Sequence, residues 1–398
     1  MSKYVIDSAT LVSIGDAVRE KDGTTAAILV KDIPARILAI ETGGGSGGGG
    51  FEIPESAFTI KGPSALGEPC EYMFAHGKWD WFIELYGDRI KTEKLDDTAH
   101  HMFYDSNLKK IPFDLNFTSN QGTDMSSMFA DCFNLEEIPK ISGVKPIQTS
   151  YIFSGCRRLK EIPESVYEDW DWSNIDTQTT TSLGKMDGMF SDCHSLRKLP
   201  MKFLSHGNPV ASYNYSIYYN GFVDCNALDE IVDLPIPHRN AKWTAAYASV
   251  FYRTFHYCSR LKRLTFETNE DGSPIVLSQV KSQSLDLSAW VGYAASSEES
   301  QLKTYAGFTT DKKVTNDATY QALKNDEDWY TCDVNYSRYN HDSAVETINS
   351  LPDVSAGGSN TIKFTGASGA KTDGGAINTL TEEEIAVAAA KGWTVSLA

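Results

Sequence analysis

The stretch "MFADCFNLEEIP" (residues 128–139) recurs along the chain with the same residue types at the same offsets. "IFSGCRRLKEIP" occupies 152–163 and "MFSDCHSLRKLP" occupies 189–200. In each copy a phenylalanine stands three residues before a cysteine, a leucine three residues after it, and an isoleucine or leucine three residues later. A pattern that recurs in this way indicates one structural unit built several times.

Five full copies follow one another, and an earlier copy at 102–112 has Ser106 in place of the cysteine and is one residue short. The aligned cysteines are Cys132, Cys156, Cys193, Cys225 and Cys258. The closest are 24 residues apart and the others 32 to 37. Periods of about 20–29 residues with leucine and cysteine at fixed places are typical of leucine-rich repeats.

The predicted fold is therefore an α/β repeat solenoid, a leucine-rich-repeat-like stack in which each repeat gives one short strand and a looser return arm. The strand is expected around L-x-x-[IL]-P. A single repeat has no core of its own, whereas stacked repeats share one. In the first full copy we expect Phe129, Cys132, Leu135 and Ile138 to point inward, and Glu136 and Glu137 outward. The longer spacings predict loops inserted on one side of the stack.

Composition and motif placement divide the chain into five parts. They are a small helical anchoring segment at 1–42, a glycine-rich hinge at 43–50, an N-terminal cap at 51–100, the repeat body at 101–266, and C-terminal strand-helix repeats with a cap at 267–398. Whether the last part continues the solenoid or forms a separate domain stays open at this point.

The N-terminal anchor is predicted from two short helical patterns. Its apolar positions at helical spacing are Leu11, Ile14, Val18, Ile33, Ile37 and Ile40. The sequence "GGGSGGGG" that follows is typical of a flexible coil. We interpret it as a natural hinge, with an engineered fusion linker as the alternative.

The last part carries recognisable helix and strand signals. A strand is predicted at 360–366 and a helix at 341–352, capped by Asp342 or Ser343. Thr381 and Glu384 form a capping-box pattern at the start of a second helix, and Gly392 is expected to end it.

Charge and hydropathy exclude several classes of partner. The formal net charge of −17 argues against broad electrostatic binding to nucleic acid or to an anionic membrane. No run approaches about 18 apolar residues, so we expect no membrane insertion. The N-terminal residues do not resemble a secretory signal, which predicts a protein made and folded in the reducing cytoplasm.

Chemical motifs are weak. The seven cysteines form no C-x-x-C pair, so disulfides and zinc are disfavoured, and a buried ladder of thiols is the preferred interpretation. His100 and His101 are adjacent, and neighbouring side chains in a helix or strand face apart, so no metal site is expected. "GASGAKT" (366–372) lacks the spacing of a phosphate loop. Acidic pairs such as Asp169 and Asp171 leave a glycosidase as an alternative.

The insertions between repeats are rich in aromatic residues, which suit binding surfaces because they combine an apolar ring with a polar tip. The candidate ligand-binding residues are Trp170, Trp172, Tyr213, Tyr215, Tyr218 and Tyr219. The alternative is that they pack the insertions onto the stack.

The pattern F-x-x-C-x-x-L-x-x-[IL]-P resembles the surface-protein type of leucine-rich repeat first associated with bacterial adhesins. The surrounding sequence is similar to versions encoded by bacteriophages, in "IDSATLVSIGDAVREKDGT" near the start, in "FEIPESAFTIKG…WDWFIELYGDRI" at 51–90, and in "LTEEEIAVAAAKGWTV" near the end. This resemblance implies a virion appendage such as a tail fibre, a baseplate component or a head decoration.

The leading hypothesis is a non-enzymatic phage structural protein without metal or cofactor. Residues 1–42 would bind other virion proteins, and the repeat body would bind a host surface glycan or protein. A homo-oligomer is expected, because several copies multiply weak contacts. The alternatives are a capsid decoration or baseplate protein that binds only virion proteins, a bacterial surface adhesin, and a polysaccharide depolymerase.

Overall fold

The computed structural model describes most of the repeat region and parts of the C-terminal region. The described residues are 58–61, 70–77, 79–95, 98–118, 122–177, 186–205, 220–225, 227–228, 230–236, 254–255, 258, 261, 263–277, 284–286, 336–337, 340–357, 359–364, 371–372 and 379–397. The predicted anchor and hinge, 1–50, lie outside them, and so do Tyr213, Tyr215, Tyr218 and Tyr219.

The described elements are short strands, a few helices and long stretches of turn. The strands are β1 (Thr59–Lys61), β2 (Lys91–Glu93), β3 (Leu115–Asn116), β4 (Thr123–Asp124), β5 (Ile141–Ser142), β6 (Pro146–Gln148), β7 (Glu230–Leu234), β8 (Arg263–Phe266), β9 (Ser284–Asp286), β10 (Tyr336–Ser337), β11 (Asn360–Lys363), β12 (Lys371–Thr372) and β13 (Trp393–Ser396). The helices are α3 (Asp80–Tyr86), α4 (Ser173–Thr177), α5 (Met201–Leu204), α8 (His341–Ser350) and α9 (Glu382–Ala390), with 3₁₀ turns η3 (Ala75–Gly77), η4 (Gly87–Arg89) and η5 (Glu164–Val166).

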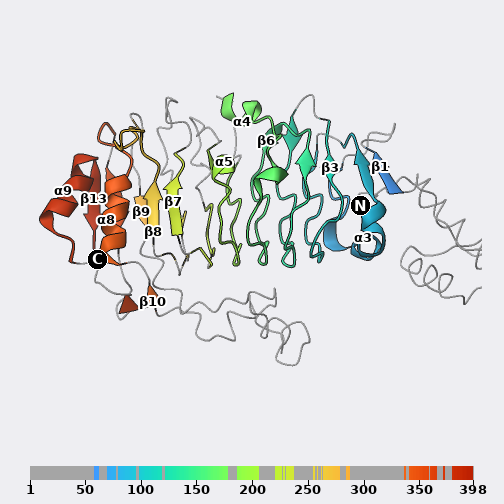
Figure 1. The fold of residues 1–398 in the computed structure, drawn as a ribbon, viewed down its shortest axis with the longest axis horizontal. Helices are drawn as coiled ribbons and strands as arrows, with labels where there is room; N and C mark the ends of the chain where they lie inside the picture. Colours follow the sequence, from blue (N-terminus) through green and yellow to red (C-terminus); the bar gives the residue numbers. More distant parts are fainter. Residues whose placement is uncertain are drawn as a thin grey trace, which may run out of the picture.

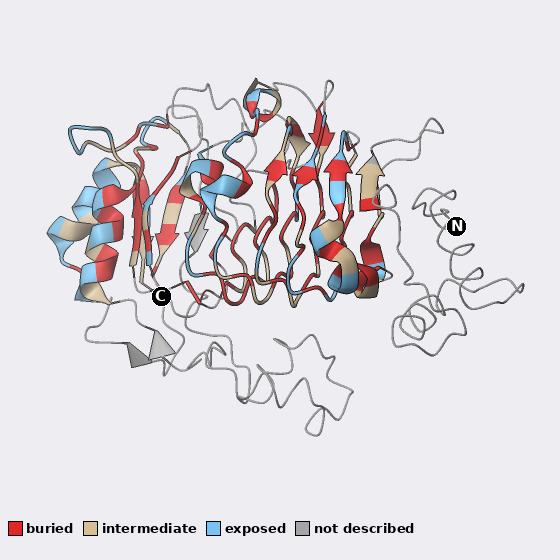
Figure 2. Ribbon diagram, turned by 45° about the vertical axis from the view of Figure 1, so that its right-hand side comes forward, coloured by how far each residue is buried: buried red, intermediate tan, exposed pale blue. Residues whose placement is uncertain are grey.

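Successive copies of the sequence repeat lie side by side along the long axis of the molecule (Figure 1). All paired strands are parallel: β1 with β2, β3 with β5, β4 with β6, β7 with β8, β10 with β12, and β9 and β13 on either side of β11. Parallel pairing of consecutive repeats requires the chain to advance one repeat and return to the same side each time. Figure 2 shows buried residues following one another from copy to copy through the interior.

The most regular part of each copy is the turn that contains the phenylalanine, which we call the turn ladder. The Phe103 N–H donates to Met128 O at 2.8 Å, the Phe129 N–H to Ile152 O at 2.9 Å, and the Phe153 N–H to Met189 O at 3.1 Å. The segment predicted as a loose return arm is thus bonded to its neighbours as regularly as the strands are.

The phenylalanine rings of the turn ladder stack on one another. Adjacent centroids are 4.9–5.9 Å apart with interplanar angles of 5–19°. The stacked residues are Phe74, Phe103, Phe129, Phe153, Phe190, Phe222 and Phe255. Each ring is at most 2% exposed, so the stack forms a continuous apolar column along the molecule.

Two backbone positions adopt the left-handed conformation in each turn from Phe74 to Phe222, and aspartate often fills the second. Asp131 has φ of 60° and Asp192 has φ of 59°. Aspartate, asparagine and glycine tolerate this region better than other residues. The third copy has Gly155 at this place, with φ of 77°, where an added Cβ would lie 2.6 Å from Asp131 Oδ1. Glycine therefore leaves room there for the carboxylate of the preceding copy.

The repeated cysteines donate hydrogen bonds between copies. The thiol of Cys156 donates to Phe129 O at 3.2 Å, and the Cys156 backbone N–H donates to Phe153 O within its own turn. The same thiol contact is made by Cys132, Cys193, Cys225 and Cys258, at 2.9–3.1 Å. Burial raises the pKa of the Cys132 and Cys193 thiols, so they stay protonated and remain donors. The described cysteines are free thiols.

The first full copy is oriented as the sequence predicts. Phe129, Cys132, Leu135 and Ile138 are buried, which confirms the inward set. Glu137 is exposed, whereas Glu136 is half-buried and pairs with Arg158 at 3.0 Å. Strands β3 and β5 begin shortly after the isoleucine-proline pair of their copies. The residues just before the pairs are linked between these two copies by one isolated parallel bridge, from Lys110 to Glu137.

The stack includes a turn within 51–100, the part predicted to be a cap. The Phe74 N–H donates to Met102 O at 2.8 Å, and Tyr72 and His76 occupy the two left-handed positions. The helix α3 follows, and its first residue explains why the next turn has serine in place of cysteine. Ser106 Oγ donates to the buried carboxylate of Asp80 at 2.8 Å. A hydroxyl is a stronger donor to a carboxylate than a thiol is.

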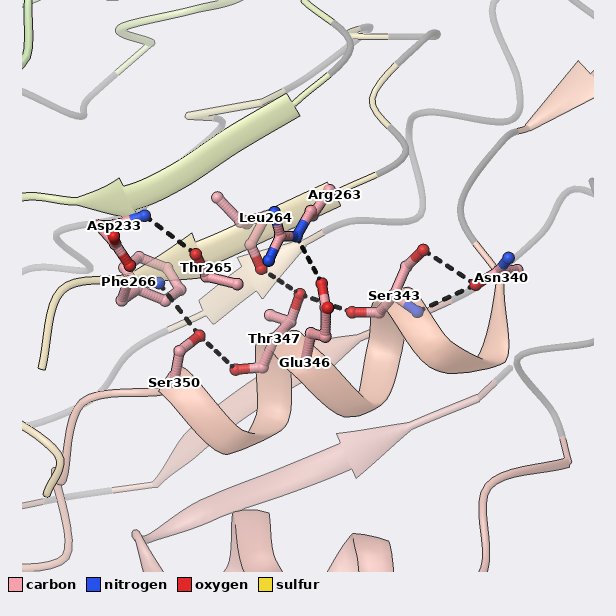
Figure 3. Close-up of polar contacts among 10 residues, drawn as sticks. All are labelled: Asp233, Arg263, Leu264, Thr265, Phe266, Asn340, Ser343, Glu346, Thr347 and Ser350. Carbon is pink, nitrogen blue, oxygen red and sulfur yellow. Dashed lines mark hydrogen bonds and ion pairs between the residues drawn. The ribbon is translucent and has the colours of Figure 1, made fainter. Parts of the chain in front are cut away.

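At the other end, helix α8 lies along strand β8 and bonds to it through side chains (Figure 3). Thr347 Oγ1 donates to Leu264 O at 2.6 Å, and the Phe266 N–H donates to Ser350 Oγ at 3.0 Å. These two hydroxyls bond to a backbone C=O and a backbone N–H of β8, which in a larger sheet would pair with a further strand. Buried backbone groups need such partners. Arg263 and Glu346 add an ion pair at 2.7 Å on the more exposed side.

The C-terminal elements match most sequence signals. Strand β11 lies inside the predicted 360–366 strand, and Thr381 and Glu384 form the capping box at the start of α9. Gly392 has φ of 82° after α9, and an added Cβ there would lie 2.6 Å from Ser355 Cα. The predicted cap of α8 was wrong: Asn340 caps the helix by accepting from the Ser343 N–H, and Asp342 lies inside its first turn.

One hydrophobic cluster runs from Phe58 to Trp393 among the described residues. The backbone connects the cysteine repeats to the C-terminal elements, because Leu277 N–H donates to Asp353 O and Val354 N–H donates to Lys391 O. Within the described part of the chain, no helix combines the length and the apolar character needed to cross a bilayer.

The buried thiols give a direct test of the turn ladder. In a Cys332→Ser background, which removes the cysteine outside the described residues, we expect a thiol reagent such as Ellman's reagent to modify no cysteine in buffer and all of them in denaturant. The reason is that the repeat cysteines are at most 2% exposed and protonated. Rapid labelling of more than a trace of thiol in buffer would contradict the ladder.

Candidate binding surface on the repeat insertions

In three copies of the repeat, the segments that vary in length follow the same point of the pattern. The segments Ser127–Pro139, Tyr151–Pro163 and Gly188–Pro200, each from the first left-handed residue to the proline, have equal length. The connecting segments that follow, 140–150, 164–187 and 201–219, differ in length. Since the constant segments are held in register by the turn ladder, the described beginnings of the variable segments leave the stack at equivalent points.

The insertion after Pro163 is held by an aromatic cluster, which we define as Tyr167, Trp170, Trp172 and Phe203. Phe203 is fully buried and lies in α5, which belongs to the next insertion. Its ring centroid is 4.6 Å from that of Trp172, 5.5 Å from that of Trp170 and 5.4 Å from that of Tyr167. Two consecutive insertions therefore pack against each other around one phenylalanine.

Backbone contacts attach this cluster to the stack below. Trp170 Nε1–H donates to Ile141 O at 2.8 Å, and the Asp171 N–H donates to Val144 O at 3.0 Å. Asp171 also accepts from the Ser173 N–H at 3.0 Å and so orders the start of α4. The hydrogen bonds from Ser173 and the nearby Lys145 keep the pKa of Asp171 below its ordinary value.

The sequence-predicted residues thus take two different positions. Trp170 and Trp172 lie together in the insertion, but they are only 6% and 7% exposed, and the polar tip of Trp170 bonds to the stack. Packing is a large part of their role, as the alternative interpretation held. Tyr167 and Phe203 were not singled out from the sequence, although "MKFL" follows a repeat proline in the same way as the tryptophan-rich stretch does.

A shallow depression of about 370 Å³ opens on the outer side of the aromatic cluster. Tyr167, Trp170 and Trp172 line it together with the polar residues Glu168, Asp171, Ser173 and Lys202. Lys140 lies 3.3 Å from Glu168 and 3.2 Å from Asp169, and Lys145 lies 3.4 Å from Asp171. Pockets that bind small molecules commonly combine aromatic walls with a few polar groups. We take this depression as the candidate binding site.

A second polar group lies along the turns, formed by Asp131, Arg157, Asp192, His194 and Asp224. Arg157 comes from the copy that has glycine at the aspartate position, and its guanidinium lies 5.7 Å from the Phe133 ring centre. Burial lowers the pKa of Arg157, against the neighbouring carboxylates that raise it. Burial acts to raise the pKa of Asp192, but the contact with His194 and the charge of Arg157 together outweigh it, and the pKa is lowered. This arrangement balances buried charges within the stack.

Histidines gather at the N-terminal end of the turn ladder. His100 and His101 have ring centroids 3.8 Å apart, so the expectation that their side chains face apart was wrong. The cause is the left-handed backbone at His101, with φ of 55°, which belongs to neither a helix nor a strand. Tyr72 stacks on His101 at 4.7 Å, and burial lowers the pKa of His101 to about 4. Among the described residues, no cluster of histidine, cysteine and carboxylate side chains has the arrangement of a metal site.

The half-buried Asp224 predicts a pH dependence of stability. Burial, and next the Asp192 carboxylate, raise its pKa to about 7. A carboxyl whose pKa is higher in the folded than in the unfolded state favours folding while protonated. That contribution is complete below about pH 4 and is lost as the pH rises to about 7.

Asp224→Asn is therefore expected to raise the free energy of unfolding at pH 8 by about 1–3 kcal/mol relative to the wild type, with the gain shrinking toward pH 4. Asparagine also tolerates the φ of 60° at this position. Urea unfolding at several pH values measures this. The matched control is Asp105→Asn, at the equivalent left-handed position of another turn, where the side chain is 46% exposed. A gain independent of pH would contradict the assignment.

Comparison with known proteins adds no relative. Neither the family models, nor the curated proteins, nor the solved structures gave a match to this chain.

Proposed function

We propose that the chain is a non-enzymatic structural protein of a bacteriophage virion, a tail fibre or receptor-binding appendage built as a leucine-rich-repeat-like solenoid. Residues 1–42 would attach it to other virion proteins, and residues 43–50 would act as a hinge. The repeat body would bind the host surface through its insertions. The chain acts by adhesion and carries out no reaction.

The observation that carries this proposal is the contrast between constant turns and variable insertions. A ladder of stacked rings and backbone bonds keeps the described turns uniform, and the described insertion residues follow the same point of the repeat. Insertions on one face of a repeat stack are often its binding face. A rigid support with a variable surface suits a protein that selects a partner.

The chemistry of the cysteines favours support over catalysis. A reactive thiol needs a lowered pKa and access to solvent. The repeat thiols have raised pKa values because they are buried, and each donates to a phenylalanine carbonyl. Their regularity is that of a structural contact.

The shape of the candidate site suits binding through many copies. An open depression of about 370 Å³ offers little contact to a single ligand. Several such sites on one particle raise the overall affinity, because each further contact forms within the same complex. The homo-oligomer expected for an appendage would supply these copies.

An antibody raised against the purified chain tests the proposal. We expect it to label phage particles in electron micrographs, and deletion of residues 1–42 to remove the protein from particles while the repeat body still folds, as circular dichroism would show. Labelling of the bacterial surface alone would contradict the proposal and support an adhesin. Release of sugar from capsule by the pure protein would instead support a depolymerase.

A further inference from the structure

We infer that the depression beside the aromatic cluster takes an uncharged sugar unit and rejects anionic polymers. This inference rests on the proposed function, since it specifies what the insertion surface recognises. Three properties of the site support it: its size, the pairing of its charges, and the small exposed area of its aromatic rings.

Size limits the ligand to a small group. Pockets that bind small molecules commonly measure about 300–1,000 Å³. The depression, at about 370 Å³ and open to solvent, is at the small end of this range. It is suited to one or two rings of a longer chain whose remainder lies outside.

Charge pairing disfavours an anion. Lys202 pairs with Glu164, and Lys140 pairs with both Glu168 and Asp169. Lys145 pairs with Asp171. Carboxylates therefore outnumber the ammonium groups of this set, four to three. A uronate or phosphate would have to displace a carboxylate from its lysine and remain close to it.

The same pairing also suits hydroxyl groups. Glu168 and Asp171 are both about half exposed, at 46% and 56% of their side chains, so their oxygens can accept hydrogen bonds from a ligand without breaking the ion pairs. Ser173, also in the lining, can donate or accept. An uncharged ring with several hydroxyls can form hydrogen bonds with these groups, and no charge on the ligand has to lose its water.

The aromatic rings offer little exposed surface. Trp170 and Trp172 each pack against Phe203 in a T-shaped geometry and against each other in a tilted one, and each is less than 10% exposed. An apolar peptide side chain needs a deep pocket in which to bury its surface, which so small an exposed aromatic area does not provide. The C–H groups of a sugar ring need only a partial apolar contact. The site therefore fits a sugar better than an apolar peptide anchor.

The test is a titration of the intact protein followed by the indole N–H signals of Trp170 and Trp172 in a ¹⁵N–¹H spectrum. Trp170→Phe and Trp172→Phe variants assign the two signals, and the indole of Trp81, on α3, is the internal control. The neutral probes are methyl glucoside, methyl galactoside and N-acetylglucosamine, and the anionic probes are glucuronate, galacturonate and inorganic phosphate.

We expect at least one neutral probe to shift the Trp172 signal with millimolar affinity, and every anionic probe to bind at least fivefold more weakly. Asp171→Asn and Glu168→Gln should each raise glucuronate binding severalfold, a gain that misfolding cannot produce. The matched control is Glu161→Gln, which alters another lysine-paired carboxylate and should change nothing.

The inference would be overturned if no neutral probe shifted the Trp172 signal, or if the anionic probes bound as tightly as the neutral ones. Either result leaves the virion assignment standing if the antibody labels particles. Conversely, if neutral sugars bind but the antibody labels only bacterial surfaces, the sugar site is supported and the virion role is overturned.

Discussion

In the turns from Phe103 to Phe222, one phenylalanine carbonyl accepts two hydrogen bonds. Phe153 O accepts the Cys156 N–H from its own turn at 3.1 Å and the thiol of Cys193 from the next turn at 3.1 Å. The first bond closes the turn, and the second fixes the distance to its neighbour. Because a buried carbonyl has two lone pairs to satisfy, a small side chain with one weak donor is favoured at the cysteine position. The phenylalanine rings of these turns stack at the same spacing.

This constraint separates support from recognition. Residues from the first left-handed position to the proline cannot change in number without breaking the register of the turns. The connection to the next turn has no such limit, and it is there that the chain adds the tryptophans and the lysine-carboxylate pairs. The regular cysteine turns are flanked by different contacts. Asp80 accepts the hydroxyl of Ser106 on the N-terminal side, and Thr347 and Ser350 bond to strand β8 on the C-terminal side.

The parts of the structure that repeat, or that depend on residues close in sequence, could be predicted from the sequence. The inward set around Cys132 and the capping box of Thr381 and Glu384 depend on residues close in sequence. The turn at Tyr72–Gly77 was not predicted because it has neither the cysteine nor the leucine of the pattern. The burial of Trp170 and Trp172 depends on Phe203, about one repeat away, whose importance appears only when two insertions pack together. The close contact of His100 and His101 required a left-handed backbone that their sequence alone does not indicate.

The central claim is that the turns form one continuous ladder, and residue-resolved hydrogen exchange tests it most directly. The N–H groups of Phe129 and Phe153 donate to neighbouring turns inside the stack, whereas the Gly272 N–H closes a local turn whose residue is exposed. The account predicts that the two phenylalanine amides exchange only through unfolding of the stack, with equal free energies, and that the Gly272 amide exchanges many times faster. Phenylalanine amides that exchange as fast as that of Gly272, or independently of each other, would contradict the ladder.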